Sequence, residues 1–187
     1  LLGVVPGEVP KEWPAEALKA QAVAARSYAL ASLVKGKLWD LYADVRSQAY
    51  YGVERESPST SAAVTATHGE VLTYDGKVVT AFYYSSSGGR TAASEDVFGV
   101  PVAYLQSVDD PWDEVSPFHR WEPHVFTAVA LTKAFGLSST VTDVSAVQTA
   151  SGRPSTLLLT TRDGATVELR AADVRARLGL RSTAFRL

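Results

Sequence analysis

The sequence predicts an α+β fold in which antiparallel β-hairpins and short helices accompany a central Ala-rich helix. Three observations support this prediction. Eight of the twenty residues 14–33 are Ala, which is typical of a buried helix that other backbones approach closely. The Asp-Gly pairs at 75–76 and 163–164 lie between β-favouring runs, the pattern of type I′ hairpins. Gly136 and Gly179 follow short helical patterns, as C-terminal glycines do.

The elements are expected in a clear order along the chain. They are helices at about 14–34 and 58–67, strands at 70–74, 77–84 and 122–127, a helix at 128–136, strands at 141–150, 155–161 and 166–170, and a helix at 171–178. Pro14 suits the first turn of its helix, and Glu16 favours the same helix end. Residues 92–121 are expected to be mostly irregular. The pattern also allows two lobes, 1–121 and 122–187, around a groove.

Composition excludes several classes of function. The 18 basic and 20 acidic residues give a net charge of -2, so we expect no nucleic-acid partner. The chain has no Cys, which excludes disulfides, thiolate zinc sites and a thiol nucleophile. The GxSxG, GxxxxGK[ST] and GxGxxG motifs are absent, so esterase, P-loop and dinucleotide-binding chemistry is not indicated.

No membrane span is expected, because Gln21, Arg26 and Ser27 interrupt the longest apolar stretch, residues 20–33. The sequence does not begin with Met, and we therefore expect a mature form or an excised domain, with any signal peptide or anchor outside it.

Glu8 is a candidate general acid. It lies between Pro6 and Pro10 with valines around it, where a stiff backbone and partial exclusion of water would favour the protonated form that a general acid needs. The alternative is that Glu8 only favours the dipole of a nearby helix, a role for which Glu12 and Glu16 lie closer to the helix start.

Other polar side chains are less specific. Lys19 and Arg26 are seven residues apart and share one helix face, although both could simply extend to solvent. His68, His119 and His124 form no zinc motif and are interpreted as structural or surface histidines.

Four segments resemble the stage II sporulation protein D family, also called the SpoIID/LytB amidase-enhancer domain. They are LLGVVPGEVPKEWPAEALKAQAVAARSYAL at the start, AFYYSSSGGRTAASEDVFG at 81–99, PVAYLQSVDDPWD at 101–113 and LGLRSTAFRL at 178–187. Together they run from the first residue to the last, which implies a single domain of this family over 1–187. Within the opening motif, Val9 replaces the usual Met.

The resemblance implies a lytic transglycosylase that acts on peptidoglycan glycan strands, with Glu8 as its catalytic acid. It also places Lys19 and Arg26 near the active-site groove, with Gln21 on the same helix. Further candidate substrate-binding groups, from backbone donors, hydroxyls and aromatic faces, are Tyr83, Tyr84, Ser85, Ser86, Ser87, Gly88, Gly89 and Ser94. No cofactor is expected.

One departure from the family concerns zinc. Sporulation members carry two Cys and a His in the stretch that matches 40–50, and the corresponding positions here are Tyr42, Arg46 and Ser47. Because these are poor zinc ligands, we expect no metal and instead packing of Trp39, Tyr42, Tyr50 and Tyr51. The preference of sporulation members for peptide-stripped glycan is not carried over to this chain.

Three functions remain open. The first is a lytic transglycosylase with one Glu. The second is a non-catalytic wall-binding module that stimulates a cell-wall amidase or other hydrolase, and the third is a structural domain of a larger surface protein. An extracytoplasmic location, in the cell wall or secreted, is expected in each case.

Overall fold

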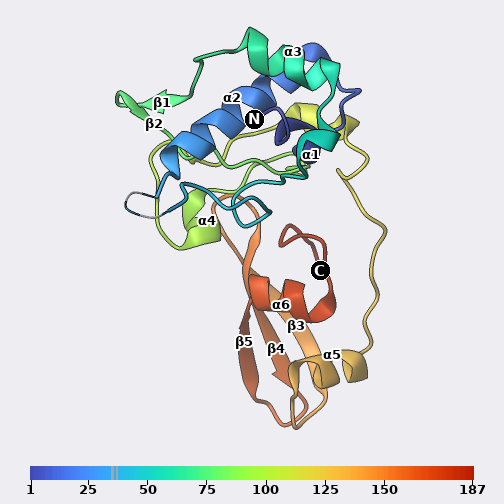
Figure 1. Ribbon diagram of the computed structural model, residues 1–187. Coiled ribbons are helices and arrows are strands. Elements are labelled where there is room, and N and C mark those ends of the chain that lie inside the picture. Colours follow the sequence, from blue (N-terminus) through green and yellow to red (C-terminus); the bar gives the residue numbers. More distant parts are fainter. Residues whose placement is uncertain (35, 37) are drawn as a thin grey trace. The chain divides into compact units, whose positions relative to one another are not determined.

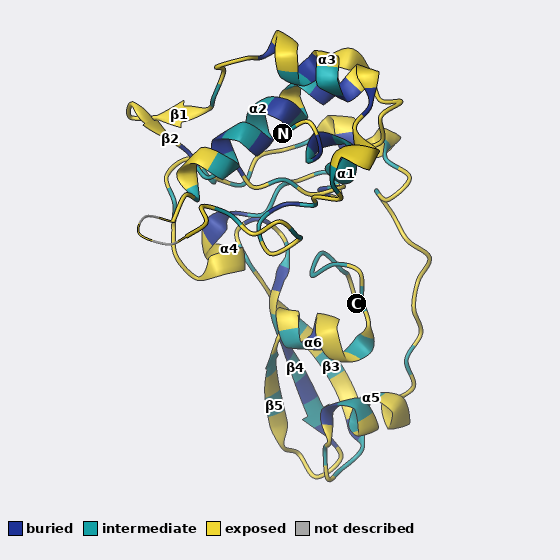
Figure 2. Ribbon diagram, in the orientation of Figure 1, coloured by how far each residue is buried: buried dark blue, intermediate teal, exposed yellow. Residues whose placement is uncertain are grey.

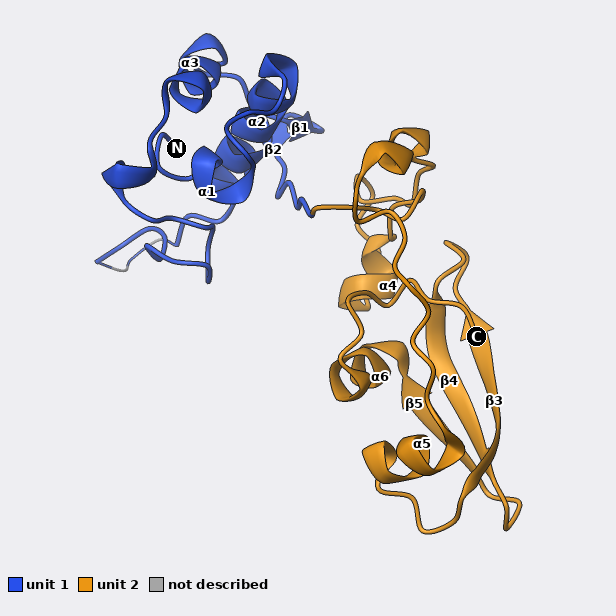
Figure 3. Ribbon diagram, turned by 90° about the vertical axis from the view of Figure 1, so that its right-hand side faces the viewer, with its two compact units in different colours: residues 1–84 blue, residues 85–187 orange. Residues whose placement is uncertain are grey.

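The computed structural model describes residues 1–34, 36 and 38–187, and it confirms the α+β class. The chain forms two compact units, Leu1–Tyr84 and Ser85–Leu187 (Figure 3). This division lies ahead of the lobe boundary expected at 121. The physical reason is that residues 90–109 pair with each other inside the second unit, as in the bridge between Arg90 and Asp109 and the bond from Ser94 N–H to the Leu105 carbonyl.

The first unit is mainly helical (Figure 1). Its elements are α1 (Val5–Glu8), α2 (Ala15–Ala31), the 3-10 helix η1 (Val53–Arg55), α3 (Pro58–Ala66), β1 (Thr73–Tyr74) and β2 (Lys77–Val78). The predicted helices at 14–34 and 58–67 are confirmed. The predicted hairpin is confirmed too, although its strands are only two residues long.

The core of this unit shows why α2 is rich in Ala. Leu18 and Ala22 of α2 contact Val5 and Val9 from the α1 region and Ala63 of α3. Small side chains on α2 let the two shorter helices approach it closely. Figure 2 shows buried and half-buried residues along α2 and buried residues in α3.

The second unit contains a three-stranded sheet. Its elements are α4 (Ser94–Phe98), the 3-10 helix η2 (Pro111–Val115), α5 (Ala128–Phe135), β3 (Val141–Gln148), β4 (Pro154–Thr161), β5 (Thr166–Arg170) and α6 (Ala171–Leu178). The strands are antiparallel in the order β3-β4-β5. Leu157 and Leu159 of the central strand pack with Phe135 of α5 and Val174 of α6, which forms the second core.

The strand expected at 122–127 is wrong. No strand is found there, and Val125 is 92% exposed. Pro123 has no N–H for a ladder, and a β-favouring run without a partner strand does not become a strand. The segment 92–121, expected to be mostly irregular, contains the short helices α4 and η2.

Within the part of the chain that the structure describes, no helix combines the length and the apolarity needed to cross a lipid bilayer.

Candidate active site around Glu8

Helix α1 determines the position of Glu8, its last residue. Pro6 occupies the first turn, where its fixed φ suits a helix and its missing N–H leaves no bond unmade. Val5 and Val9, on either side, are buried in the core of the first unit. The anchored valines hold the half-buried Glu8 in place, and Val9 keeps the position of the family's Met apolar.

One carboxylate oxygen of Glu8 is held by two donors. The Ala49 N–H donates to Oε1 at 2.6 Å, and the Tyr83 hydroxyl donates to the same atom at 3.2 Å. Among the described residues, none donates a hydrogen bond to Oε2. The two oxygens therefore differ, with Oε1 fixed by the protein and Oε2 left for a proton or a ligand.

Gln48 fixes the direction of the Tyr83 hydroxyl. Its buried Nε2 donates to the Ala25 carbonyl of α2 at 3.1 Å and to the Tyr83 oxygen at 3.0 Å. Because that oxygen accepts from Gln48, its own proton points to Glu8. Burial raises the pKa of Tyr83 to about 12; the hydrogen bond from Gln48 opposes this, and the charge of Glu8 adds a further, lesser increase. Tyr83 is thus a donor at neutral pH.

The two glycines of the opening motif, Gly3 and Gly7, lie where a side chain would clash with neighbouring groups. A Cβ on Gly7 would lie 2.8 Å from the Ala49 carbonyl oxygen and 3.2 Å from the Tyr51 ring. A Cβ on Gly3 would lie 2.8 Å from the Tyr50 ring. The Ala49 backbone, whose N–H bonds to Glu8, lies this close to α1 only because Gly7 lacks a side chain.

A pocket of about 260 Å³ adjoins this network. Tyr28 and Phe82 form an edge-to-face pair on its wall, with ring centroids 6.0 Å apart. The lining residues are Glu8, Tyr28, Val45, Ser47, Gln48, Ala49, Ala81, Phe82 and Tyr83. Its volume approaches the roughly 300 Å³ at which small-ligand sites begin, and the candidate acid lies in its wall.

Within the described part of the chain, none of the three α2 candidates makes a hydrogen bond or ion pair with Glu8. Lys19 Nζ lies 2.6 Å from Glu16 Oε1 on the helix surface. Arg26 donates to the Glu70 and Val64 carbonyls at 2.8 and 3.2 Å, so it ties α2 to the end of α3 and the loop beyond it. Gln21 Nε2 is buried and has no partner among the described residues. Their roles toward substrate stay predictions.

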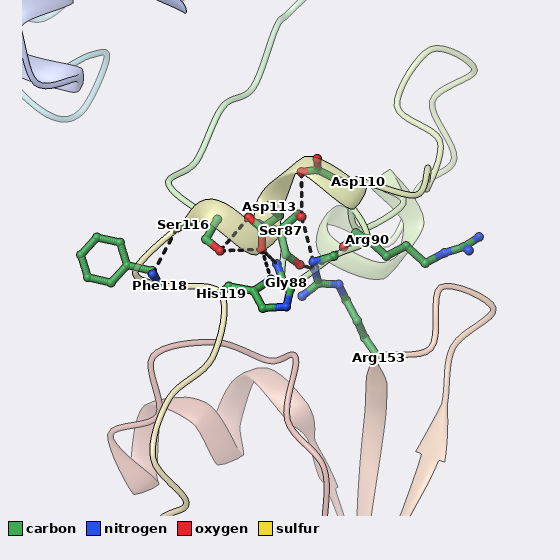
Figure 4. Close-up of polar contacts among 11 residues, drawn as sticks. Ser87, Gly88, Arg90, Asp110, Asp113, Ser116, Phe118, His119 and Arg153 are labelled. Atoms are coloured by element: carbon green, nitrogen blue, oxygen red, sulfur yellow. Dashed lines mark hydrogen bonds and ion pairs between the residues drawn. The ribbon is translucent and has the colours of Figure 1, made fainter. Parts of the chain in front are cut away.

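The Ser/Gly loop holds a carboxylate of its own unit (Figure 4). Ser86 Oγ donates to Asp113 at 2.8 Å, and the Ser87 and Gly88 amides donate to it at 2.8 and 2.9 Å. Burial alone would raise the pKa of Asp113, but these bonds and one from His119 lower it to about 2. Two of the predicted backbone donors therefore face Asp113, a residue that the sequence did not single out.

The other loop candidates have mixed surroundings. Tyr84, at the end of the first unit, and Ser85 are exposed, whereas Gly89 is half-buried and its N–H donates to Ser87 Oγ at 3.1 Å. Ser94 is 2% exposed, and its hydroxyl accepts from the Val102 N–H at 2.7 Å. Their roles in substrate binding also stay predictions.

Tyr42, Arg46 and Ser47, the positions that match the zinc ligands of sporulation members, make contacts among themselves and with Asp44. The Arg46 guanidinium lies 4.0 Å from the centre of the Tyr42 ring and 2.6 Å from Asp44. Ser47 Oγ accepts from the Tyr42 N–H at 3.0 Å. This donor set does not fit zinc, and no group of three His, Cys, Asp or Glu side chains suited to a metal occurs in residues 1–34, 36 and 38–187.

Aromatic packing accompanies this region. The Trp39 and Tyr42 rings lie 6.1 Å apart, and Tyr50 and Tyr51 cover Gly3 and Gly7.

Comparisons with known proteins show which proteins the chain is similar to. A family model described as stage II sporulation protein matches residues 1–74. An uncharacterised protein of Brachyspira hyodysenteriae is 44% identical over 109 residues, or 57% of this chain and 30% of that protein. The amidase enhancer of Bacillus subtilis is 42% identical over 113 residues, or 60% of this chain and 15% of the enhancer.

A third relative is stage II sporulation protein D of Bacillus subtilis. It is 32% identical over 206 aligned positions, which cover 99% of this chain and 58% of that protein. The chain thus spans between 15% and 58% of the length of these relatives.

Proposed function

Since the chain belongs to the stage II sporulation protein D family, we propose that it acts on the bacterial cell wall as a lytic transglycosylase that cleaves peptidoglycan glycan strands. The observation that carries the proposal is that Glu8, in the wall of a pocket, has two hydrogen-bond donors on Oε1 and none among the described residues on Oε2. A single carboxyl group that must first give and then take a proton needs one oxygen held in place and the other accessible.

Most glycosidases need two carboxyl groups, one to protonate the leaving oxygen and one to act as nucleophile or to activate water. A lytic transglycosylase needs one, because the C6 hydroxyl of the muramoyl residue is the nucleophile. Glu8 gives its proton to the glycosidic oxygen as the bond from that oxygen to C1 breaks. The C6 oxygen then bonds to C1, and its proton passes to the Glu8 carboxylate, which leaves a 1,6-anhydromuramoyl end and a free hydroxyl on the other product.

The surrounding residues have separate roles in this mechanism. The lone pairs of Oε1 are engaged by Ala49 and Tyr83, so the catalytic proton resides on Oε2. When Glu8 becomes an anion, both donors stabilise it. Gln48 keeps the Tyr83 hydroxyl aimed at Oε1 and is a positioning residue.

The test uses glycan strands with and without stem peptides, followed by mass spectrometry for anhydromuramoyl ends. The wild-type chain should form these ends, and Glu8→Gln should not, because an amide has no proton to give. Glu12→Gln, a change to an exposed carboxylate in the same stretch, should retain activity. Equal activity of Glu8→Gln, or cleavage without anhydro products, would contradict the proposal.

A second candidate function is stimulation of a cell-wall amidase through binding to the wall, in an extracytoplasmic location. It is supported by the 42% identity to a protein named amidase enhancer. Binding to intact sacculi and the rate of a purified amidase with added chain would test it. Full stimulation by Glu8→Gln would favour this function over catalysis, and absence of both binding and stimulation would exclude it.

A further inference from the structure

Asp113 in the second unit lies at the centre of a hydrogen-bond cluster that the Glu8 mechanism does not use (Figure 4). Its side chain is 4% exposed and accepts from Ser86, from the Ser87 and Gly88 amides, and from Nδ1 of His119 at 2.6 Å. With a pKa of about 2, Asp113 is an anion at neutral pH. Every partner of Asp113 must therefore be a donor.

This arrangement determines the tautomer of His119. Nδ1 carries a hydrogen because it faces a carboxylate, so in the neutral ring the lone pair is on Nε2. Gln21 Nε2 is the only buried side-chain nitrogen or oxygen without a partner in the described part of the chain. The Nε2 atom of His119 has no partner among the same residues and is not in this buried set, so it retains some contact with solvent in a side chain that is 16% exposed.

A purely structural role explains this geometry poorly. Asp113 already accepts three hydrogen bonds from the Ser/Gly loop, so it is satisfied without a histidine. A carboxylate that holds Nδ1 while Nε2 keeps a solvent contact is the arrangement by which proteins orient an imidazole toward a ligand. Metal ligation is disfavoured, because no further His, Cys, Asp or Glu group in the described residues completes a site with His119.

The segment that carries His119 also exposes aromatic side chains. Trp112, next to Asp113, is 81% exposed, and Phe118 and Trp121 are 46% and 37% exposed. Burial of Asp113 in η2 anchors the segment while its large apolar neighbour remains at the surface. Sites that present an apolar face together with a polar tip suit ligands that are themselves amphipathic, such as sugar rings.

We propose that His119 is a glycan-binding residue of the second unit, whose Nε2 exchanges a hydrogen bond with a sugar hydroxyl. The hydroxyl group is a suitable partner because it both donates and accepts, and so it pairs with Nε2 in the neutral and in the protonated ring. The choice of a glycan as ligand rests on the proposed function, but binding here does not require cleavage at Glu8.

The test measures binding in the Glu8→Gln chain, so that the ligand is not cleaved. Glycan strands freed of stem peptides are titrated while the ring signals of the histidines are followed by NMR. The His119 signals should shift with saturation, and those of His68, exposed beyond α3, should not. Unmoved His119 signals, or absence of glycan binding, would overturn the proposal.

A substitution separates the two nitrogens of the ring. In His119→Asn the amide Nδ2 takes the place of Nδ1 and can donate to Asp113, but no atom replaces Nε2. The melting temperature should be kept and the affinity for glycan should fall roughly 3–10-fold, the value of one hydrogen bond. His68→Asn is the matched control and should change neither.

Unchanged affinity of a folded His119→Asn chain would overturn the proposal. If that variant is destabilised, the NMR titration of the parent decides. Failure of the lyase proposal is seen separately, as absence of anhydromuramoyl ends from the wild-type chain, and it leaves the His119 result intact.

Discussion

Replacing Gly7 by Ala should disturb the site without touching Glu8 itself. The new Cβ would lie 2.8 Å from the Ala49 carbonyl oxygen, a backbone atom that can move away only together with its peptide. Overpacking of this kind costs about 1–3 kcal/mol, of which the better helix propensity of Ala recovers up to about 1 kcal/mol. With that recovery subtracted in full, we expect a net destabilisation of up to about 2 kcal/mol.

The effect on activity should be larger than the effect on stability. Movement of Ala49 lengthens the 2.6 Å bond from its N–H to Glu8 Oε1. Hydrogen bonds to charged groups contribute about 1.5–3 kcal/mol, so the loss of this one should lower the rate of glycan cleavage about 10- to 100-fold. The assays are the yield of anhydromuramoyl ends and the free energy of unfolding in denaturant.

Gly3→Ala is the matched control. Its Cβ would meet the ring of Tyr50 at 2.8 Å, a contact that does not involve Ala49. It should cost comparable stability and much less activity. Wild-type activity of a Gly7→Ala chain, or equal losses of activity in both variants, would refute the packing argument.

Three further changes test other contacts. Asp113→Asn should destabilise the second unit. Because the folded-state pKa of Asp113 is depressed, the wild-type chain should lose about 2 kcal/mol of stability as the pH falls from about 4 through 2. Thermal melts that show no change of stability over this acid range would contradict this. Tyr83→Phe should slow cleavage about tenfold. The wild type should lose stability as the pH rises from about 10 toward 12, because the folded-state pKa of Tyr83 is raised, and the variant should not show this loss. Identical alkaline unfolding of both chains would argue against this. Arg26→Met should lower the free energy of unfolding in denaturant by about 2 kcal/mol, because the hydrogen bonds of Arg26 to the Val64 and Glu70 carbonyls are lost. Unchanged stability together with lost glycan binding would instead support a role of Arg26 in substrate binding.

Much of the fold could be predicted because its signals are local. The Ala-rich run with Pro14 before it, and Asp-Gly pairs between β-favouring residues, gave helix α2 and both hairpins. The strand expected at 122–127 failed because strand formation depends on a partner, and Pro123 reduces what a partner could bond. The residues of a segment do not show whether a partner strand will lie beside it.

The candidate site was predictable only in part. Glu8 was identified by its place in the opening motif, and the two valines beside it are buried as the apolar context indicated. Gln48 and Asp113 were missed because their importance arises from distant partners, the Ala25 carbonyl and the Ser/Gly loop. A polar residue in a loop of ordinary composition gives no signal of such contacts.

The most direct test of the central claim is mass spectrometry of glycan strands incubated with the wild-type chain and with Glu8→Gln. The proposed mechanism predicts 1,6-anhydromuramoyl ends with the wild type and none with the variant. Anhydro ends formed equally by both chains would contradict the assignment of Glu8 as the acid and base.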